Sequence, residues 1–163
     1  MRDRILAASR SIFLDEGLDA LSMRRVAQEV GISAMTIYIY FENRQAIVLA
    51  LLREGLALLE HRLVEATKSD DPMSRIDDLS KAYLDFAEEH PRYYGAFTCP
   101  VEMHAELDVD SATALAREYC DALSPLRKTL VSMFPETGVA DNRLVAIVSA
   151  IHGFASLRGH ISS

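Results

Sequence analysis

The stretch from Leu21 to Phe41, LSMRRVAQEVGISAMTIYIYF, constrains the fold more than any other part of the chain. It predicts two short helices joined by a tight turn. Ser22 and Ser33 are placed to cap these helices, because a hydroxyl there can accept a backbone N–H that has no partner within the helix. Gly31 stands where a left-handed residue would end the first helix and turn the chain. We therefore expect a helix-turn-helix unit.

The second predicted helix has two different sides. Ala34, Ile37 and Phe41 recur at a spacing that puts them on one side, where they can pack on the first helix. The outward surface then carries Ser33, Met35, Thr36, Tyr38, Ile39 and Tyr40. A surface of hydroxyls, phenols and apolar side chains is unusual for a solvated helix, but it suits a helix that lies in the major groove of DNA. A helical hairpin that only packs is the alternative.

The rest of the chain also has a helical pattern. Glycines and prolines lie at segment edges and no period-2 strand pattern is present, which predicts an all-α fold. We expect a three-helix head at residues 1–46 and a helical body at residues 47–163. The helices are expected at about 3–16, 43–67, 74–89, 92–98, 111–134 and from about 142, besides the two short ones. Pro125 should kink or restart the fifth of these.

A long helix from about Asn43 to Thr67 connects the two predicted domains. Its leucines at positions 49, 52, 56, 59 and 63 follow a 3-4 spacing, which predicts a narrow apolar seam. Because this helix begins in the head and ends in the body, it can carry a displacement from one to the other.

The charge distribution allows DNA binding through one end only. The net charge is −7 over 163 residues, but residues 1–50 hold six arginines and six acids, so their net charge is zero. The excess negative charge therefore lies on residues 51–163. Because phosphate neutralisation supplies most non-specific affinity for DNA, we expect that term to be weak here.

Other classes of protein find little support in the sequence. We expect no catalytic residues, cofactor or metal, since there is no G-x-S-x-G, P-loop, H-E-x-x-H or dinucleotide fingerprint. The acidic segment from Glu102 to Asp110 around His104 could hold a cation, although a solvated loop is the preferred interpretation. We expect Cys99 and Cys120 to be reduced thiols. With no signal peptide and no membrane-spanning run, a cytoplasmic protein is expected.

The middle of the chain is rich in aromatic residues and methionine. Their number predicts an apolar pocket with a few polar groups for a small, mostly hydrophobic ligand, with ordinary core packing as the alternative. The expected pocket residues are Tyr83, Phe86, Tyr94, Phe97, Met103, Tyr119, Leu123 and His152.

The last predicted helix has a second, weakly polar face of small residues. Small side chains let another helix approach closely, so this face suits a subunit contact. The expected dimer-interface residues are Ser149, His152, Gly153 and Ser156. His152 could alternatively be a core histidine or hydrogen-bond the ligand.

Residues 5–52 resemble the N-terminal domain of the tetracycline-repressor (TetR) family of bacterial transcription regulators. The resemblance runs through ILAASRSIFLDEGLDALSMRRVAQEVGIS and continues through AMTIYIYFENRQAIVLALL. Later, HPRYYGAF and IHGFASLRGH are similar to one subgroup of the family. The resemblance implies a homodimeric, all-helical repressor that binds a double-stranded DNA operator. An effector in the C-terminal body would change the separation of the two heads.

Positions matching the family motif imply roles for individual residues. Thr36 and Tyr38 would contact phosphates, and Met35, Ile39 and Tyr40 would face bases. Ser22 and Arg24 would reach the DNA from the preceding helix, and Ser33 would begin the reading helix. Arg44 would contact the DNA backbone, although the family usually has lysine there. Ile39 stands at a position that is often polar or aromatic, and it can touch a thymine methyl but cannot donate a hydrogen bond.

The resemblance also implies a further long helix after Arg158, which is absent from this sequence. We expect either a shortened chain or a reduced dimer interface. We predict a TetR-like regulator, most simply a repressor released from a palindromic operator by a small hydrophobic effector. The alternative is a helical dimeric scaffold whose head does not bind DNA.

Overall fold

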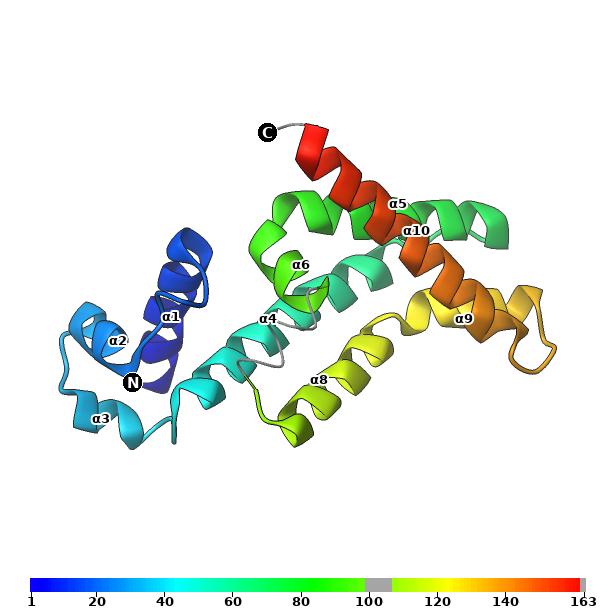
Figure 1. The fold of residues 1–163 in the computed structure, drawn as a ribbon. Coiled ribbons are helices and arrows are strands. Elements are labelled where there is room, and N and C mark those ends of the chain that lie inside the picture. Colours follow the sequence, from blue (N-terminus) through cyan, green and yellow to red (C-terminus); the bar gives the residue numbers. More distant parts are fainter. Residues whose placement is uncertain (99–106, 162–163) are drawn as a thin grey trace. The chain divides into compact units, whose positions relative to one another are not determined.

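The computed structural model describes residues 1–98 and 107–161, and regular structure in those residues is entirely helical (Figure 1). This confirms the predicted all-α fold. The helices are α1 (Arg2–Glu16), α2 (Met23–Val30), α3 (Ala34–Tyr38), α4 (Arg44–Glu65), α5 (Pro72–Glu89), α6 (Pro91–Thr98), α8 (Val109–Ala122), α9 (Ser124–Met133) and α10 (Val139–Ile161). None of the helices within the described residues combines the length and hydropathy that a bilayer crossing requires.

The chain divides into two compact units, which we call the head unit and the body unit. The head unit comprises Met1–Gly55 and Gly95–Leu115, and the body unit comprises Leu56–Tyr94 and Ala116–Ser163. Residues 47–55 of α4 thus lie in the head unit, beyond the expected boundary at residue 46. The side chains of Ile47, Val48, Leu51 and Leu52 are buried in that stretch.

The predicted helix-turn-helix is present, and its caps form as the sequence indicates. The Ser22 hydroxyl accepts a hydrogen bond from the Arg25 backbone N–H at 3.2 Å, and that of Ser33 accepts one from Thr36 N–H at 3.2 Å. Gly31 is left-handed, with φ 74° and ψ 37°. These local interactions end α2 and begin α3 within four residues, because each satisfies backbone groups that the helix ends leave open.

The second helix of the pair, α3, is shorter than the periodicity predicts. α3 ends at Tyr38, but the Tyr40 and Phe41 N–H groups still bond to the carbonyl of Ile37, so residues 39–41 continue as a tightened turn. Ile37 and Phe41 are buried, as their spacing predicts.

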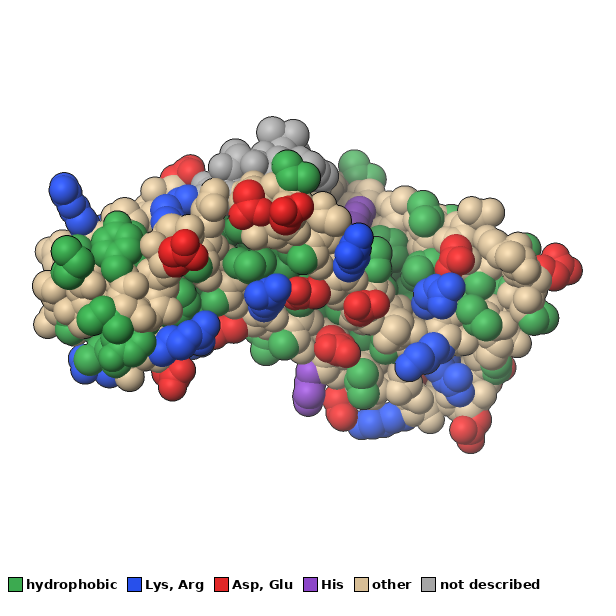
Figure 2. Space-filling model, turned by 90° about the horizontal axis from the view of Figure 1, so that it is seen from below, with side chains coloured by type: hydrophobic (Ala, Val, Ile, Leu, Met, Phe, Trp, Pro, Cys, Tyr) green, Lys and Arg blue, Asp and Glu red, His purple; other side chains and the backbone are tan. Residues whose placement is uncertain are grey.

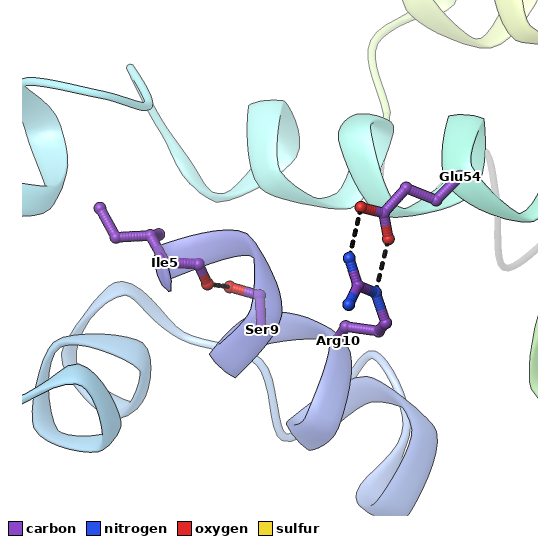
Figure 3. A network of polar contacts seen from close by, with 4 residues as sticks. All are labelled: Ile5, Ser9, Arg10 and Glu54. Atoms are coloured by element: carbon purple, nitrogen blue, oxygen red, sulfur yellow. Dashed lines mark hydrogen bonds and ion pairs between the residues drawn. The ribbon is translucent and has the colours of Figure 1, made fainter. Parts of the chain in front are cut away.

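The head unit has its core between α1, α2, α3 and the start of α4. Ile5 and Phe13 from α1 are buried, as is Val26 from α2. Within α1, the buried hydroxyl of Ser9 donates to the Ile5 carbonyl at 2.8 Å (Figure 3). That bond satisfies the hydroxyl inside an otherwise apolar layer.

In the body unit α5, α9 and α10 pack on one another. Asp71 caps α5 through the Ser74 N–H at 2.8 Å, and Pro72 takes the first helical position, where its missing N–H costs nothing. The expected helix over residues 111–134 is two helices, α8 and α9, because Pro125 restarts the chain rather than kinking it. This agrees with one of the two predicted outcomes.

The last helix begins earlier than the sequence predicts. The sequence indicates a start near Asn142, whereas α10 begins at Val139. Gly138 adopts a left-handed φ of 79° and ends the loop there, and its carbonyl accepts the Asn142 N–H at 3.1 Å. The first helical turn thus forms directly after the glycine.

Candidate nucleic-acid interface

The outward face of α3 and the turn after it is exposed and largely apolar. Met35 is 76% exposed and Ile39 is 75% exposed, and the rings of Tyr38 and Tyr40 are also exposed. In the space-filling view, hydrophobic side chains gather on the surface of the head (Figure 2). Exposing large apolar side chains to water is unfavourable, so an exposed cluster of them indicates a surface that contacts a binding partner.

Two hydroxyls lie beside these side chains at the start of α3. Ser33 Oγ and Thr36 Oγ1 are 2.9 Å apart and share one hydrogen bond, while Ser33 also caps the helix. Ser33 is exposed and Thr36 is half-buried. The pair therefore presents lone pairs and one remaining hydroxyl hydrogen to a partner in a fixed arrangement.

The two adjacent arginines of α2 have different surroundings. Arg25 forms an ion pair with Glu16 at 2.7 Å, which links α2 to the last turn of α1. Arg24, one residue earlier, is exposed, as is the preceding N-cap residue Ser22. The structure thus distinguishes the two exposed cations, which the sequence RR alone does not, by the Glu16 carboxylate that pairs with Arg25.

Arg44, the first residue of α4, contacts the loop between α1 and α2. Its Nε donates to the Leu21 carbonyl and its Nη2 to the Leu18 carbonyl, each at 2.6 Å. The sequence offers no local signal for these bonds, since they join residues 23 and 26 positions apart. A phosphate contact by Arg44 stays a prediction.

Other arginines of residues 1–50 make contacts within the head unit. Arg10 pairs with Glu54, Arg4 donates to the Val30 carbonyl at 3.3 Å, and the Arg2 guanidinium lies 4.7 Å from the centroid of the Phe41 ring. These side chains contribute to the fold of the head. Weak non-specific attraction to phosphates stays a prediction.

Three of the predicted pocket residues form a polar cluster inside the body unit. Tyr83 Oη lies 2.6 Å from Tyr119 Oη and 2.7 Å from His152 Nε2, and the distance from Tyr119 Oη to His152 Nε2 is 3.3 Å. The residues come from α5, α8 and α10. Tyr94 adds its ring, which meets the Tyr83 and His152 rings edge-on at centroid distances of 6.4 and 5.7 Å.

Burial disfavours the charged forms of all three side chains in this cluster. It raises the pKa of Tyr83 far above the ordinary phenol value, with the neighbouring Tyr119 as a smaller cause, and raises the pKa of Tyr119 to about 12. Burial also lowers the pKa of His152. The arrangement can therefore exchange hydrogen bonds with an uncharged polar group, but it is a poor environment for an ion.

The other predicted pocket residues do not all join this cluster. Phe86 and Leu123 are buried core residues of the body unit, and Phe97 lies on the part of α6 that belongs to the head unit. Met103 lies outside the described residues. A hollow of about 340 Å³ lies between the end of α4 and α5, and its lining includes Glu65, Lys68 and Asp78, unlike the apolar pocket expected.

The residues predicted for a subunit contact on α10 differ in their exposure to solvent. Ser149, Gly153 and Ser156 are exposed or only partly covered, together with the large apolar side chains of Val145, Phe154 and Leu157. His152 is instead half-buried and directed at Tyr83 and Tyr119. The structure thus shows His152 with the buried cluster, and its part in a subunit contact stays a prediction.

Two other predicted features fall partly outside the described residues. Cys120 is an exposed free thiol, while Cys99 and most of the acidic segment around His104 lie outside them. Among the described side chains, those of residues 1–98 and 107–157, no group of three or more that could ligate a metal comes together.

Comparison with known protein families identifies both parts of the chain. Residues 5–51 match the family described as "Bacterial regulatory proteins, tetR family", and residues 76–160 match "Tetracyclin repressor-like, C-terminal domain". The second match alone spans more than half of the chain. The chain belongs to the TetR family of bacterial regulatory proteins, and its head is a helix-turn-helix domain.

Individual relatives are distant. An uncharacterized HTH-type transcriptional regulator of Mycobacterium tuberculosis is 27% identical over 184 residues, covering 97% of this chain and 90% of that protein. The nucleoid occlusion factor SlmA of Haemophilus influenzae is 27% identical over 101 residues, covering 61% of this chain but only 46% of SlmA. A structure of a protein of unknown function from Rhodococcus sp. RHA1 has a TM-score of 0.79 at 23% identity, covering 98% of this chain and 82% of that one.

Proposed function

We propose that this protein is a homodimeric repressor that binds a palindromic DNA operator and releases it when a small, mostly hydrophobic effector binds. The observation that carries the proposal is the exposed surface of Met35, Tyr38, Ile39 and Tyr40 on a capped helix-turn-helix. In a head of this family, that surface is the one that would enter the major groove.

The groove-facing residues have chemically distinct tasks in this proposal. Met35 and Ile39 make apolar contacts, for which the thymine methyl is the matching group on a base edge. Thr36 and Tyr38 offer hydroxyls to phosphates, while Arg24 and the first turn of α2 approach the backbone. Because phosphate contacts position and base contacts specify, Arg24 sets affinity and salt dependence, whereas Ile39 sets sequence preference.

The exposed face of α10 supports a homodimer. Val145, Phe154 and Leu157 expose large apolar area next to the small residues Ser149 and Gly153, which allow a second helix to approach. Two heads related by a two-fold axis would meet successive major grooves about 34–36 Å apart. Replacing Leu157 with Glu should shift sedimentation from dimer to monomer, whereas the same change at exposed Met73 on α5 should not.

The cluster of Tyr83, Tyr119 and His152 supports the effector class. Neutral hydroxyls and an imidazole amid buried aromatic rings suit a ligand that is mainly apolar and carries one uncharged hydrogen-bonding group. Such a ligand can release DNA only if it binds better to the head spacing that does not fit the operator.

Retention of a labelled duplex tests the DNA-binding proposal. The duplex covers the promoter region beside the protein's own gene, and binding is followed by fluorescence anisotropy from low to physiological salt. We expect retention of a palindromic fragment and a weaker salt dependence for Arg24→Gln, with Lys128→Gln on α9 as the matched loss of an exposed cation. No retention of any fragment at low salt would instead support the scaffold protein with a head that does not bind DNA.

A further inference from the structure

Arg44, the first residue of α4, is hydrogen-bonded to the turn that precedes α2. Its planar guanidinium bridges two carbonyls, Leu21 through Nε and Leu18 through Nη2, both at 2.6 Å. The side chain is partly buried at this point. Bonds of this length from a charged donor are strong, and the fixed fork of the guanidinium sets the separation of the two acceptors.

The turn that Arg44 contacts is itself closed. The Leu21 N–H bonds to the Leu18 carbonyl at 3.0 Å, so that carbonyl accepts two hydrogen bonds. The Leu21 side chain is buried in the head core. The turn is therefore fixed from three sides, by its own hydrogen bond, by core packing and by Arg44.

This turn leads directly into the part of α2 that the proposed function places at the DNA backbone. Ser22 comes immediately after Leu21 and caps α2 through the Arg25 N–H at 3.2 Å. Arg24 projects from the same first helical turn. A displacement of the Leu21 carbonyl therefore moves the N-cap of α2 and, with it, the orientation of Ser22 and Arg24.

We infer that Arg44 is a positioning residue: it couples the start of α4 to the DNA-facing end of α2, and does not act as a phosphate ligand. The inference rests on the proposed function for its effect on DNA, but the mechanical link is a property of the head unit alone. Movement of the first turn of α4 is transmitted through the guanidinium to the α1–α2 turn. A lysine replaces this link poorly, because its three ammonium donors rotate freely and lack the rigid fork that sets the separation of the two carbonyls.

The two roles make opposite predictions for Arg44→Lys. A phosphate ligand tolerates lysine, which keeps the positive charge, while Arg44→Gln reduces the salt dependence by about 0.9 in log K per log salt for the one lost contact. A positioning residue does not tolerate lysine. Both variants then lose affinity to a similar extent, roughly tenfold or more if the α2 end is misplaced, and their salt slopes fall together, because the displaced Arg24 loses its phosphate contact in both.

The first measurement needs no DNA and tests the link directly. Amide hydrogen exchange is followed in the full-length wild type, Arg44→Lys and Arg44→Gln, with Arg24→Gln as control. We expect faster exchange at the amides of residues 21 and 25 in both Arg44 variants and wild-type rates in the control. Wild-type protection in Arg44→Lys would overturn the inference.

The second measurement is a salt titration of DNA binding by the same proteins, using the palindromic promoter fragment. Losses of affinity and of slope that are the same for Arg44→Lys and Arg44→Gln support the positioning role. Wild-type affinity for Arg44→Lys together with a reduced slope for Arg44→Gln overturns it. If the wild type retains no duplex, the proposed function fails, and the exchange rates still decide whether Arg44 holds the turn.

Discussion

Arg10 on α1 and Glu54 on α4 form an ion pair with two parallel hydrogen bonds. Arg10 Nε donates to Glu54 Oε2 at 2.8 Å, and Nη2 donates to Oε1 at 2.7 Å (Figure 3). The pair ties α1 to the part of α4 that lies in the head unit. Within the head unit, α4 is therefore bonded at two places. Arg44 at its beginning contacts the loop between α1 and α2, and Glu54, near the end of the stretch that lies in the head unit, contacts α1.

The Arg10–Glu54 pair should contribute modestly to the stability of the head. Because the side chains remain 43% and 27% exposed, we expect a coupling of about 0.5–1 kcal/mol between Arg10→Met and Glu54→Gln in a double-mutant cycle. Urea unfolding at low and high salt measures it. The coupling should shrink as salt screens the charges, and a value that is unaffected by salt would contradict an ionic origin.

Gly31 should resist substitution because of its backbone conformation and not because of space. A Cβ added at Gly31 meets nothing within 4 Å, but φ is 74°, so Gly31→Ala should cost about 1–2 kcal/mol in the free energy of unfolding. Gly31→Asn should cost less, since asparagine tolerates this conformation. Gly95→Ala is the matched control, because Gly95 lies in α6 and also has room. We expect it to be neutral or stabilising, and equal losses at both sites would contradict the assignment to backbone strain.

His152 should make the body unit sensitive to acid. Burial lowers its pKa in the folded state, so the unfolded chain binds more protons once the pH falls below about 6.5, the ordinary value for histidine. The free energy of unfolding should therefore decrease as the pH falls from about 7 to about 5. Chemical denaturation across this range measures the slope. The slope should be smaller in His152→Asn, and an unchanged slope in that variant would contradict the assignment to His152.

Ile39 should affect DNA binding without affecting stability. Its side chain is 75% exposed, so Ile39→Ala should leave the melting temperature unchanged. If the side chain packs on a thymine methyl, binding should weaken by at least about 1 kcal/mol, given about 0.8 kcal/mol for each buried methylene. Anisotropy with operator duplexes that carry uracil in place of thymine identifies the contacted position, because the loss disappears there. The exposed Met73→Ala variant should bind like the wild type.

Local backbone interactions are the features that a sequence predicts best. The predicted caps and turn at Ser22, Gly31 and Ser33 are confirmed because each acts on backbone groups within three or four residues of itself, so the local sequence contains both partners. The start of α10 is predicted too late because a local backbone conformation is not visible in the sequence pattern. The sequence pattern assigns Gly138 to a loop, although its left-handed conformation places the helix directly behind it.

Contacts between distant residues cannot be predicted in the same way. The bonds from Arg44 to the α1–α2 turn span 23 and 26 residues, and those joining Tyr83, Tyr119 and His152 span 33, 36 and 69. The composition of the middle segment indicates aromatic rings with polar groups, but not which hydroxyl meets which nitrogen. The double prediction for His152 illustrates this, since helical spacing alone places it beside Ser149 and Ser156.

The exposed apolar side chains of the head also affect how free molecules behave toward one another. Met35 and Ile39 stay uncovered whenever no partner occupies the head, and such surfaces adhere to similar surfaces on other copies. The net charge of −7, carried by residues 51–163, opposes that encounter through mutual repulsion. We expect the negative charge of residues 51–163 to keep the molecules in solution apart. Aggregation of the free protein should therefore begin near its isoelectric point, where the repulsion vanishes, and should be suppressed at pH values away from it.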